Sequence, residues 1–257
     1  NGRIALAGCC GNDARFGPNE PNETLLHQTD STYPTAYVAV YEPDGSLAWA
    51  RDFALTQWWS LACSFGVDIV EDGVVLTTGP FAEEVVAGVG TQNETELVAV
   101  EESFSIKTNN LFLARYEPDG ALAWAIRDGG PSQTEGHGVV AGDDGAIFVV
   151  GTFEGNVVFG AGTEQETALT PAGEESLFLA RYDALGQLEW VVDLGVDGAL
   201  PTPNKLVDVQ LAENGDLLIS GGFRGAMLAG DGDGAVYKEV EEWGLFLARY
   251  TADGARV

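Results

Sequence analysis

The stretch LFLARYEPDG, Leu111 to Gly120, decides the fold because it returns almost unchanged along the chain. It reappears as LFLARYDALG from Leu177 and LFLARYTADG from Leu245, and AYVAVYEPDG from Ala36 is a looser copy. The starts of successive copies are 75, 66 and 68 residues apart. Self-similarity at a nearly fixed spacing indicates that one supersecondary unit is reused.

Each repeat contains four strand-like runs in a constant order, which we name A to D. Asp-Gly or Asn-Gly joins run A to run B, as at Gly73, Gly145 and Gly215, and predicts a hairpin turn with positive φ at both turn positions. Run C is the LFLARY segment, and a turn such as PDG leads into run D. These runs are apolar on both faces, so both faces must be covered. Four-stranded antiparallel sheets stacked around an axis meet this requirement, and the sequence therefore predicts an all-β protein of the β-propeller class.

Two long stretches add a resemblance to a known family. They are AGDDGAIFVVGTFEGNVVFGAGTEQETALTPAGEESLFLARYDALGQLEW, residues 141–190, and LAENGDLLISGGFRGAMLAG, residues 211–230. Both resemble the bacterial β-propeller repeat of secreted and surface proteins, a seven-bladed-propeller-type repeat. The resemblance extends over nearly the whole chain and is weakest over residues 1–34 and 80–110. It implies a propeller fold and export, and it carries no catalytic motif.

The repeats predict one domain of about four blades. The expected blades cover about residues 1–53, 66–128, 138–194 and 207–257 of a propeller domain at 1–257. NGRIALAG, from Asn1, aligns with NGDLLISG, from Asn214, so the first repeat begins at its A–B turn. We therefore expect a part of a larger propeller, and the alternative is a ring closed by pairing of its two ends.

Charge limits the classes of partner. The chain has 40 Asp and Glu against 12 Lys and Arg, for a net charge of −28. Such a field repels phosphate backbones, so we expect no nucleic-acid partner. No apolar run approaches the ~20 residues that span a bilayer, so we expect no membrane span. GDGDG places Asp231 and Asp233 as candidate Ca²⁺ ligands, with a plain turn as the alternative, and no other cofactor is indicated.

The long segments all fall at one end of the blades, because both the B–C and the D–A connections emerge there. We name this end the top face, and loops on a rigid scaffold commonly carry binding residues. Trp58 and Trp59 lie in such a loop and could stack on sugar rings or anchor a protein partner, or could fold inward over the core. His137, between two glycines near the expected axis and just before a run A, is a second ligand-binding candidate with a structural alternative. NET at Asn22 and Asn93 matches the glycosylation acceptor pattern.

The three cysteines show no metal-ligand spacing. Cys9 and Cys10 should end a B strand, and Cys63 should precede the A strand of the next blade, so a disulfide from either to Cys63 is geometrically reasonable. Vicinal cysteines point to opposite sides of an extended chain, and we predict the pair Cys10–Cys63, with three separate thiols as an alternative. A disulfide fits an oxidising compartment.

The sequence contains no GxSxG, HExxH, P-loop or Rossmann motif. We therefore expect a non-enzymatic extracellular or cell-surface scaffold or adhesion module that binds a protein or surface partner through its top-face loops. The alternative is a glycan-binding module that uses Trp58 and Trp59. A third interpretation is a hydrolase or lyase whose loop carboxylates converge.

Overall fold

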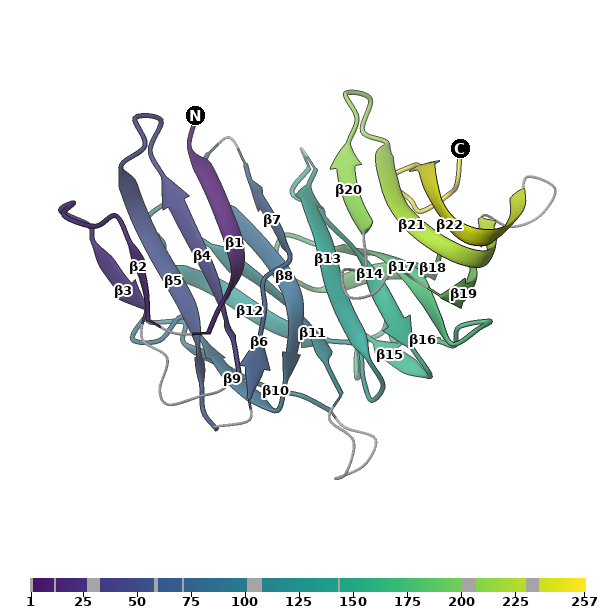
Figure 1. Ribbon diagram of the computed structural model, residues 1–257, viewed down its shortest axis with the longest axis horizontal. Helices are drawn as coiled ribbons and strands as arrows, with labels where there is room; N and C mark the ends of the chain where they lie inside the picture. Colours follow the sequence, from purple (N-terminus) through teal and green to yellow (C-terminus); the bar gives the residue numbers. More distant parts are fainter. Residues whose placement is uncertain are drawn as a thin grey trace.

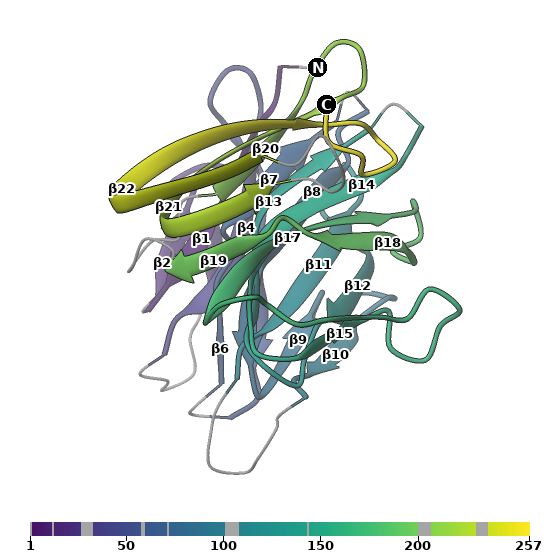
Figure 2. The same cartoon turned by 90° about the vertical axis from the view of Figure 1, so that its right-hand side faces the viewer.

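The computed structural model describes residues 2–11, 13–26, 33–57, 60–70, 72–100, 108–142, 144–199, 207–229 and 236–257. Within these ranges the chain forms antiparallel strands and no helix, as the turn-rich sequence predicts. Figures 1 and 2 show the sheets of successive repeats following one another along the molecule, in a propeller-like arrangement. The first and fourth repeats lie at opposite ends in Figure 1.

The first two repeats each contribute to a five-stranded sheet. The strands of the first repeat are β1 (Ile4–Cys10), β2 (Ala14–Phe16), β3 (Thr24–Leu26), β4 (Thr35–Tyr41) and β5 (Leu47–Leu55). Those of the second are β6 (Leu61–Ala62), β7 (Gly66–Ile69), β8 (Val75–Ala82), β9 (Glu84–Ala87), β10 (Thr95–Val98), β11 (Asn110–Tyr116) and β12 (Leu122–Asp128). The sheet orders are β1-β4-β5-β9-β10 and β12-β11-β8-β6, with β7 also paired to β8. Strands β9 and β10 thus extend the sheet of the preceding repeat.

The third and fourth repeats share one eight-stranded sheet. The strands of the third are β13 (Thr134–Ala141), β14 (Ile147–Glu154), β15 (Val157–Phe159), β16 (Thr167–Leu169), β17 (Glu175–Tyr182) and β18 (Leu188–Asp193). Then follow β19 (Val196–Ala199), β20 (Val207–Leu211), β21 (Leu217–Ala229) and β22 (Val236–Tyr250). We expected separate sheets, but β19 pairs with both β17 and the long strand β21 and so joins them.

The tight turns differ in one respect from the prediction. In both the A–B and the C–D turns only the glycine has positive φ, for example 90° at Gly73 and 82° at Gly120. The amide of Gly120 donates to the carbonyl of Glu117 at 2.8 Å, and the C–D pairing shifts register beside the turn, between Arg115 and Tyr116. A glycine in this conformation next to a one-residue bulge is a common way to close a hairpin.

Segments that we expected to be loops contain an extra hairpin in each of the first three repeats: β2–β3, β9–β10 and β15–β16. A glutamate closes each hairpin turn by accepting a backbone N–H four residues earlier in the sequence. The backbone N–H of Asn19 donates to Glu23 at 2.7 Å, that of Gly90 to Glu94 at 2.6 Å, and that of Gly162 to Glu166 at 2.7 Å. These carboxylates therefore have a structural role.

The two NET sequences belong to these hairpins. The Asn22 side-chain amide donates to the carbonyl of Leu47 at 3.1 Å, and the Asn93 amide donates to that of Leu122 at 3.0 Å. Each bond fastens the hairpin to the D strand of its own repeat. A glycan on either nitrogen would compete with this contact, so hairpin docking accounts for the motif.

The D-strand tryptophans connect successive repeats. Trp49 is buried, whereas Trp124 and Trp190 are only partly buried. The Trp49 indole N–H donates to the carbonyl of Pro118 at 3.1 Å, in the C–D turn of the next repeat. Each indole lies over a C–D turn, so packing against the next repeat fixes its position.

Candidate functional site

The A strands β7, β13 and β20 contact one another in succession along the middle of Figure 1, and His137 lies on the central one. We expected His137 just before a strand that starts at Gly138, but β13 already begins at Thr134. The pairing of β13 with β14 shifts between Gly136 and Gly138, so His137 occupies a β-bulge. Bulges re-aim a side chain out of the regular alternation.

The glycines around the bulge permit a very close approach of two repeats. A methyl group on Gly136 would lie 2.1 Å from Oγ1 of Thr78, and one on Gly66 would lie 2.8 Å from the carbonyl oxygen of His137. Only glycine fits at these two positions without displacement of a neighbour. The GHG sequence thus explains how a histidine comes to lie at the junction of two repeats.

The His137 ring is held by three kinds of contact. It stacks on Phe65 with ring centroids 5.3 Å apart and 19° between the planes. Its Nε2 lies 3.6 Å from a carboxylate oxygen of Glu135 and 3.4 Å from Oγ1 of Thr152. The Glu135 carboxylate also accepts a hydrogen bond from the Asn109 side-chain amide at 2.7 Å. The histidine side chain is only 8% exposed, so the surrounding residues hold it in one position.

This cluster borders a pocket with a volume of about 820 Å³, within the size range of ligand sites. The described lining comes from six strands (β6, β8, β13, β20, β21 and β22) and their flanking segments: Leu61, Cys63, Ser64, Phe65, Pro80, Asn109, Glu135, His137, Val207, Asp208, Ser220, Gly221, Leu245 and Phe246. Ser64 is buried, and its hydroxyl has no hydrogen-bond partner among the described residues. Phe65 is half-exposed and offers an aromatic face.

The pocket is acidic. Its described lining includes the carboxylates of Glu135 and Asp208 and no lysine or arginine. The whole chain adds a field of net charge −28. Clefts lined by one sign of charge concentrate ligands of the opposite sign. The arrangement favours a cationic group beside an aromatic ring.

Two predicted sites lie outside the described residues. These are the paired indoles Trp58 and Trp59 and the candidate Ca²⁺ ligands Asp231 and Asp233. Within the described ranges, no group of three or more His, Cys, Asp or Glu side chains is arranged to hold a metal ion. Of the predicted ligand-binding residues, the structure describes His137 alone.

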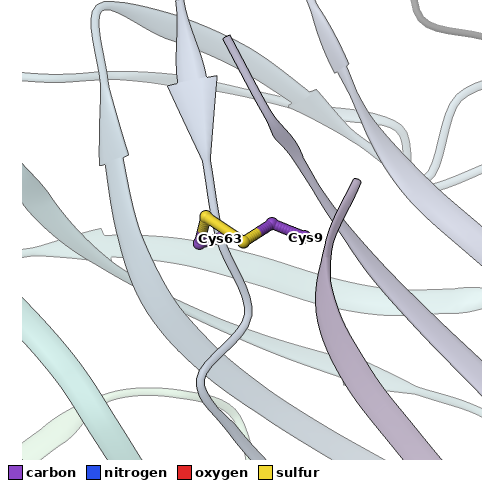
Figure 3. Close-up of a disulfide and its surroundings, with 2 residues drawn as sticks. All are labelled: Cys9 and Cys63. Atoms are coloured by element: carbon purple, nitrogen blue, oxygen red, sulfur yellow. A yellow bond between two sulfur atoms is a disulfide. The ribbon is translucent and has the colours of Figure 1, made fainter. Parts of the chain in front are cut away.

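The structure contains a disulfide, and its partner is Cys9 rather than Cys10. Cys9 and Cys63 are bonded with Cα atoms 4.8 Å apart, and Figure 3 shows the bridge from β1 to the segment before β7. We predicted the pair Cys10–Cys63, which is wrong. Cys9 pairs in register with Ala36, whose face packs against the second repeat, so the Cys9 side chain points to Cys63. Cys10 is a free thiol on the opposite side, and burial, with a smaller contribution from Asp52, raises its pKa.

A further carboxylate is buried between the second and third repeats. Asp128 accepts hydrogen bonds from the Tyr182 hydroxyl at 3.0 Å and from the amides of Gly129 and Gly160 at 2.9 and 2.8 Å. Burial raises the pKa of Asp128, although these donors oppose the shift. Asp128 is only 7% exposed, and its partners all belong to the packing of the two repeats. Its role is therefore structural.

Comparison with known proteins agrees with this architecture. No family model matches the chain. An uncharacterized WD repeat-containing protein of Acanthamoeba polyphaga mimivirus is 23% identical over 210 residues, which cover 76% of this chain and 15% of that protein. The chain thus spans only about 15% of the length of the curated relative that it matches. No helix among the described residues is long and apolar enough to cross a membrane. WD repeats are propeller-type repeats, so strands and relative together support a propeller-like fold, while the bacterial secreted family stays a prediction.

Proposed function

We propose that this chain is a non-enzymatic scaffold that binds a protein partner, and that the pocket beside His137 receives a cationic side chain of that partner. The observation that carries the proposal is the acidic, aromatic lining of this pocket, with Glu135, Asp208 and half-exposed Phe65. A rigid array of repeats presents an extended surface well suited to such binding.

The chemistry of the walls favours lysine or arginine over other groups. Two carboxylates supply acceptors for an ammonium or guanidinium group, and charged hydrogen bonds of this kind are about twice as strong as neutral ones. The face of Phe65 adds a cation–π attraction. Because Asn109 and His137 already hold Glu135 in place, little ordering of the site is required on binding.

We propose an extracellular or cell-surface location for this module. The Cys9–Cys63 disulfide supports it, since such bonds persist in oxidising compartments. The strongly acidic composition is compatible with a solvated surface protein.

Peptide binding tests the proposal. Fluorescence anisotropy would compare labelled peptides with a central lysine or arginine against the same peptides with glutamate, at about 0.15 M salt. The variant Glu135→Gln/Asp208→Asn should weaken binding of basic peptides by about tenfold or more, the value of one charged hydrogen bond. The matched control Glu164→Gln/Glu213→Gln removes the same charge from two exposed positions and should change binding by less than about twofold.

If Glu135→Gln/Asp208→Asn and the control weakened peptide binding equally, the net charge of the chain alone would account for binding. That result would contradict the assignment of the pocket as the binding site. A lack of preference for basic peptides would contradict the cationic ligand.

A glycan ligand is the second candidate, and it is favoured by the half-exposed ring of Phe65 in a pocket that is also lined by the polar side chain of Asn109. An aromatic face next to polar groups also suits a sugar ring. A glycan array probed with the wild-type chain and with Phe65→Ala distinguishes the two: sugar binding that Phe65→Ala abolishes, without binding of basic peptides, would select the glycan.

A further inference from the structure

The His137 ring contacts both kinds of group that would bind a cationic ligand in the pocket. It stacks on Phe65 with ring centroids 5.3 Å apart, and its Nε2 lies 3.6 Å from a carboxylate oxygen of Glu135. The second carboxylate of the described lining, that of Asp208, is close to the next residue along β13, since a methyl group on Gly138 would lie 3.0 Å from its Oδ1. A change of charge on His137 would therefore act on the aromatic face and on the carboxylates together.

The surrounding atoms prevent His137 from carrying a charge away from the pocket. Its side chain is 8% exposed, and its Nε2 also lies 3.4 Å from Oγ1 of Thr152. The backbone is confined as well, because a methyl group on Gly66 would lie only 2.8 Å from the carbonyl oxygen of His137. A positive charge on the imidazole would thus stay beside Glu135 and Phe65.

The charged groups of the neighbouring strands leave two carboxylates beside the imidazole. The strands in contact with β13 are β7, β8, β11, β14 and β20. Their titratable and charged side chains are Asp68, Arg115, Tyr116, Glu154 and Asp208. Of these, Asp208 lines the pocket with His137, and β13 itself adds Glu135.

The other four groups lie at the two ends of β13. Asp68 and Arg115 line a second pocket with Ala141, the last residue of β13, and Tyr116 pairs with Val75 beside the A–B turn at that end of the second repeat. The backbone N–H of Glu154 donates to the carbonyl of Gln133, which precedes β13. In the segment before β7, Cys63 is in the disulfide and does not titrate.

Histidine is the side chain whose charge ordinarily changes between about pH 5 and pH 8, whereas carboxylates ordinarily remain ionised over that range. The chain has two histidines, His27 and His137, and His137 is the one in the described lining of the pocket. The acidic lining that attracts a cationic ligand also attracts a proton to His137. The proton and the ligand are therefore competitors for the same two carboxylates.

We propose that His137 makes binding at this pocket dependent on pH: neutral imidazole permits a cationic side chain to bind, and protonation of His137 releases it. The imidazolium pairs with Glu135, which cancels one of the two negative charges of the described lining, and it places a positive charge against the Phe65 ring that the ligand would use. This inference rests on the function proposed above, because it concerns the same pocket and a cationic ligand.

Isothermal titration calorimetry with a lysine peptide tests the inference. The peptide has a central lysine, blocked ends and no histidine, so that its own charge is constant, and the salt concentration is about 0.15 M. The dissociation constant should be about tenfold higher at pH 5.5 than at pH 7.5, which corresponds to about 1.4 kcal/mol of added repulsion. At about pH 6.5, titrations in two buffers of different ionisation enthalpy should show release of up to about one proton per bound peptide.

Two variants assign the effect to one histidine. In His137→Gln the ratio of the two dissociation constants should fall below about two, whatever the affinity at pH 7.5, and proton release should disappear. His137→Asn is a second neutral replacement in case the first does not fold, and circular dichroism at both pH values checks each chain. His27→Gln is the matched control and should keep both the tenfold ratio and the proton release.

The results separate this inference from the function on which it rests. Peptide binding at pH 7.5 that is unchanged at pH 5.5 would overturn the inference and leave the cationic ligand in place. The inference would also be overturned if a folded His137 variant kept the pH dependence, or if His27→Gln removed it. Absence of peptide binding at every pH would contradict the proposed function, and this inference with it.

Discussion

Loss of the Cys9–Cys63 disulfide should destabilise the chain by a predictable amount. The bridge joins residues 54 positions apart and connects the first repeat to the entrance of the second. In the chain-entropy description, a loop of this length removes about 14 cal/mol/K from the unfolded state, or about 4 kcal/mol at 25 °C. We therefore expect Cys9→Ser and Cys63→Ser each to lower the free energy of unfolding by about 3–4 kcal/mol.

Denaturation in guanidinium chloride, without reductant, measures this difference. Cys9→Ser/Cys63→Ser should be no less stable than either single variant, because both substitutions remove the same bond. Cys10→Ser is the control and should change stability by less than about 1 kcal/mol, since Cys10 is a free thiol. Alkylation followed by mass spectrometry should label Cys10 alone, and slowly, because burial raises the pKa of its thiol.

The opposite ranking would refute the reasoning. If Cys10→Ser lost about 4 kcal/mol and Cys9→Ser lost little, the bridge would involve Cys10, and the assignment of faces along β1 would be wrong by one residue.

Three further substitutions test the packing between repeats. Trp49→Ala should lower the unfolding free energy by about 3–5 kcal/mol, since it removes a buried indole, and a loss below about 1 kcal/mol in urea denaturation would contradict that placement. Gly79→Ala should abolish or severely weaken folding, because a methyl group would lie 1.8 Å from the carbonyl oxygen of Cys63; an unchanged melting temperature would refute this. Asp128 has a raised pKa in the folded state, so its contribution to stability is greatest below its unfolded pKa and declines as pH rises through the folded value. The unfolding free energy of wild type minus that of Asp128→Asn should therefore be larger at about pH 4 than at about pH 7, and a flat difference would count against the titration of this group.

The regular part of the fold was readable because its signals are local. The LFLARY copies became β11, β17 and part of β22, and the turn glycines Gly73 and Gly120 took positive φ as the dipeptides indicate. Apolar residues on both faces of β11 and β17 correctly indicated strands covered on both sides, whereas Leu245 and Leu247 of β22 are exposed. Each of these features depends on a few neighbouring residues and on burial.

The parts that the sequence did not reveal depend on register and on distant partners. The hairpin turns closed by Glu23, Glu94 and Glu166 read as acidic loops, although a shared spacing of Glu and Thr in the three repeats was a signal that could have identified them. The choice between Cys9 and Cys10 required the register of β1 against β4. In the repeat alignment Cys9 is equivalent to Thr152, which lies on the same strand face as Val150. Val150 packs toward the following repeat, so this alignment would have placed Cys9, and not Cys10, on the face toward Cys63.

The pocket was even less accessible from sequence. Asn109, Glu135 and Asp208 come from different repeats and line one pocket because β13 lies against both β11 and β20. The flanking glycines of His137 were visible, but the bulge that orients the ring depends on pairing with β14. The predicted indoles and Ca²⁺ ligands lie outside the described residues and stay predictions.

Each D-strand tryptophan packs over the C–D turn of the following repeat, and this repeated contact has a consequence for how such chains can change in length. Since each repeat meets its neighbours through one standard pair of surfaces, a whole repeat can be duplicated or deleted without the need for a new complementary surface. A deletion that is not a whole number of repeats would remove the C–D turn that an indole packs against, such as the turn whose Ala184 carbonyl accepts the hydrogen bond of Trp124. Duplication or deletion of whole repeats therefore lengthens or shortens the array without a new interface, and the same rule would let an engineer add repeats one at a time.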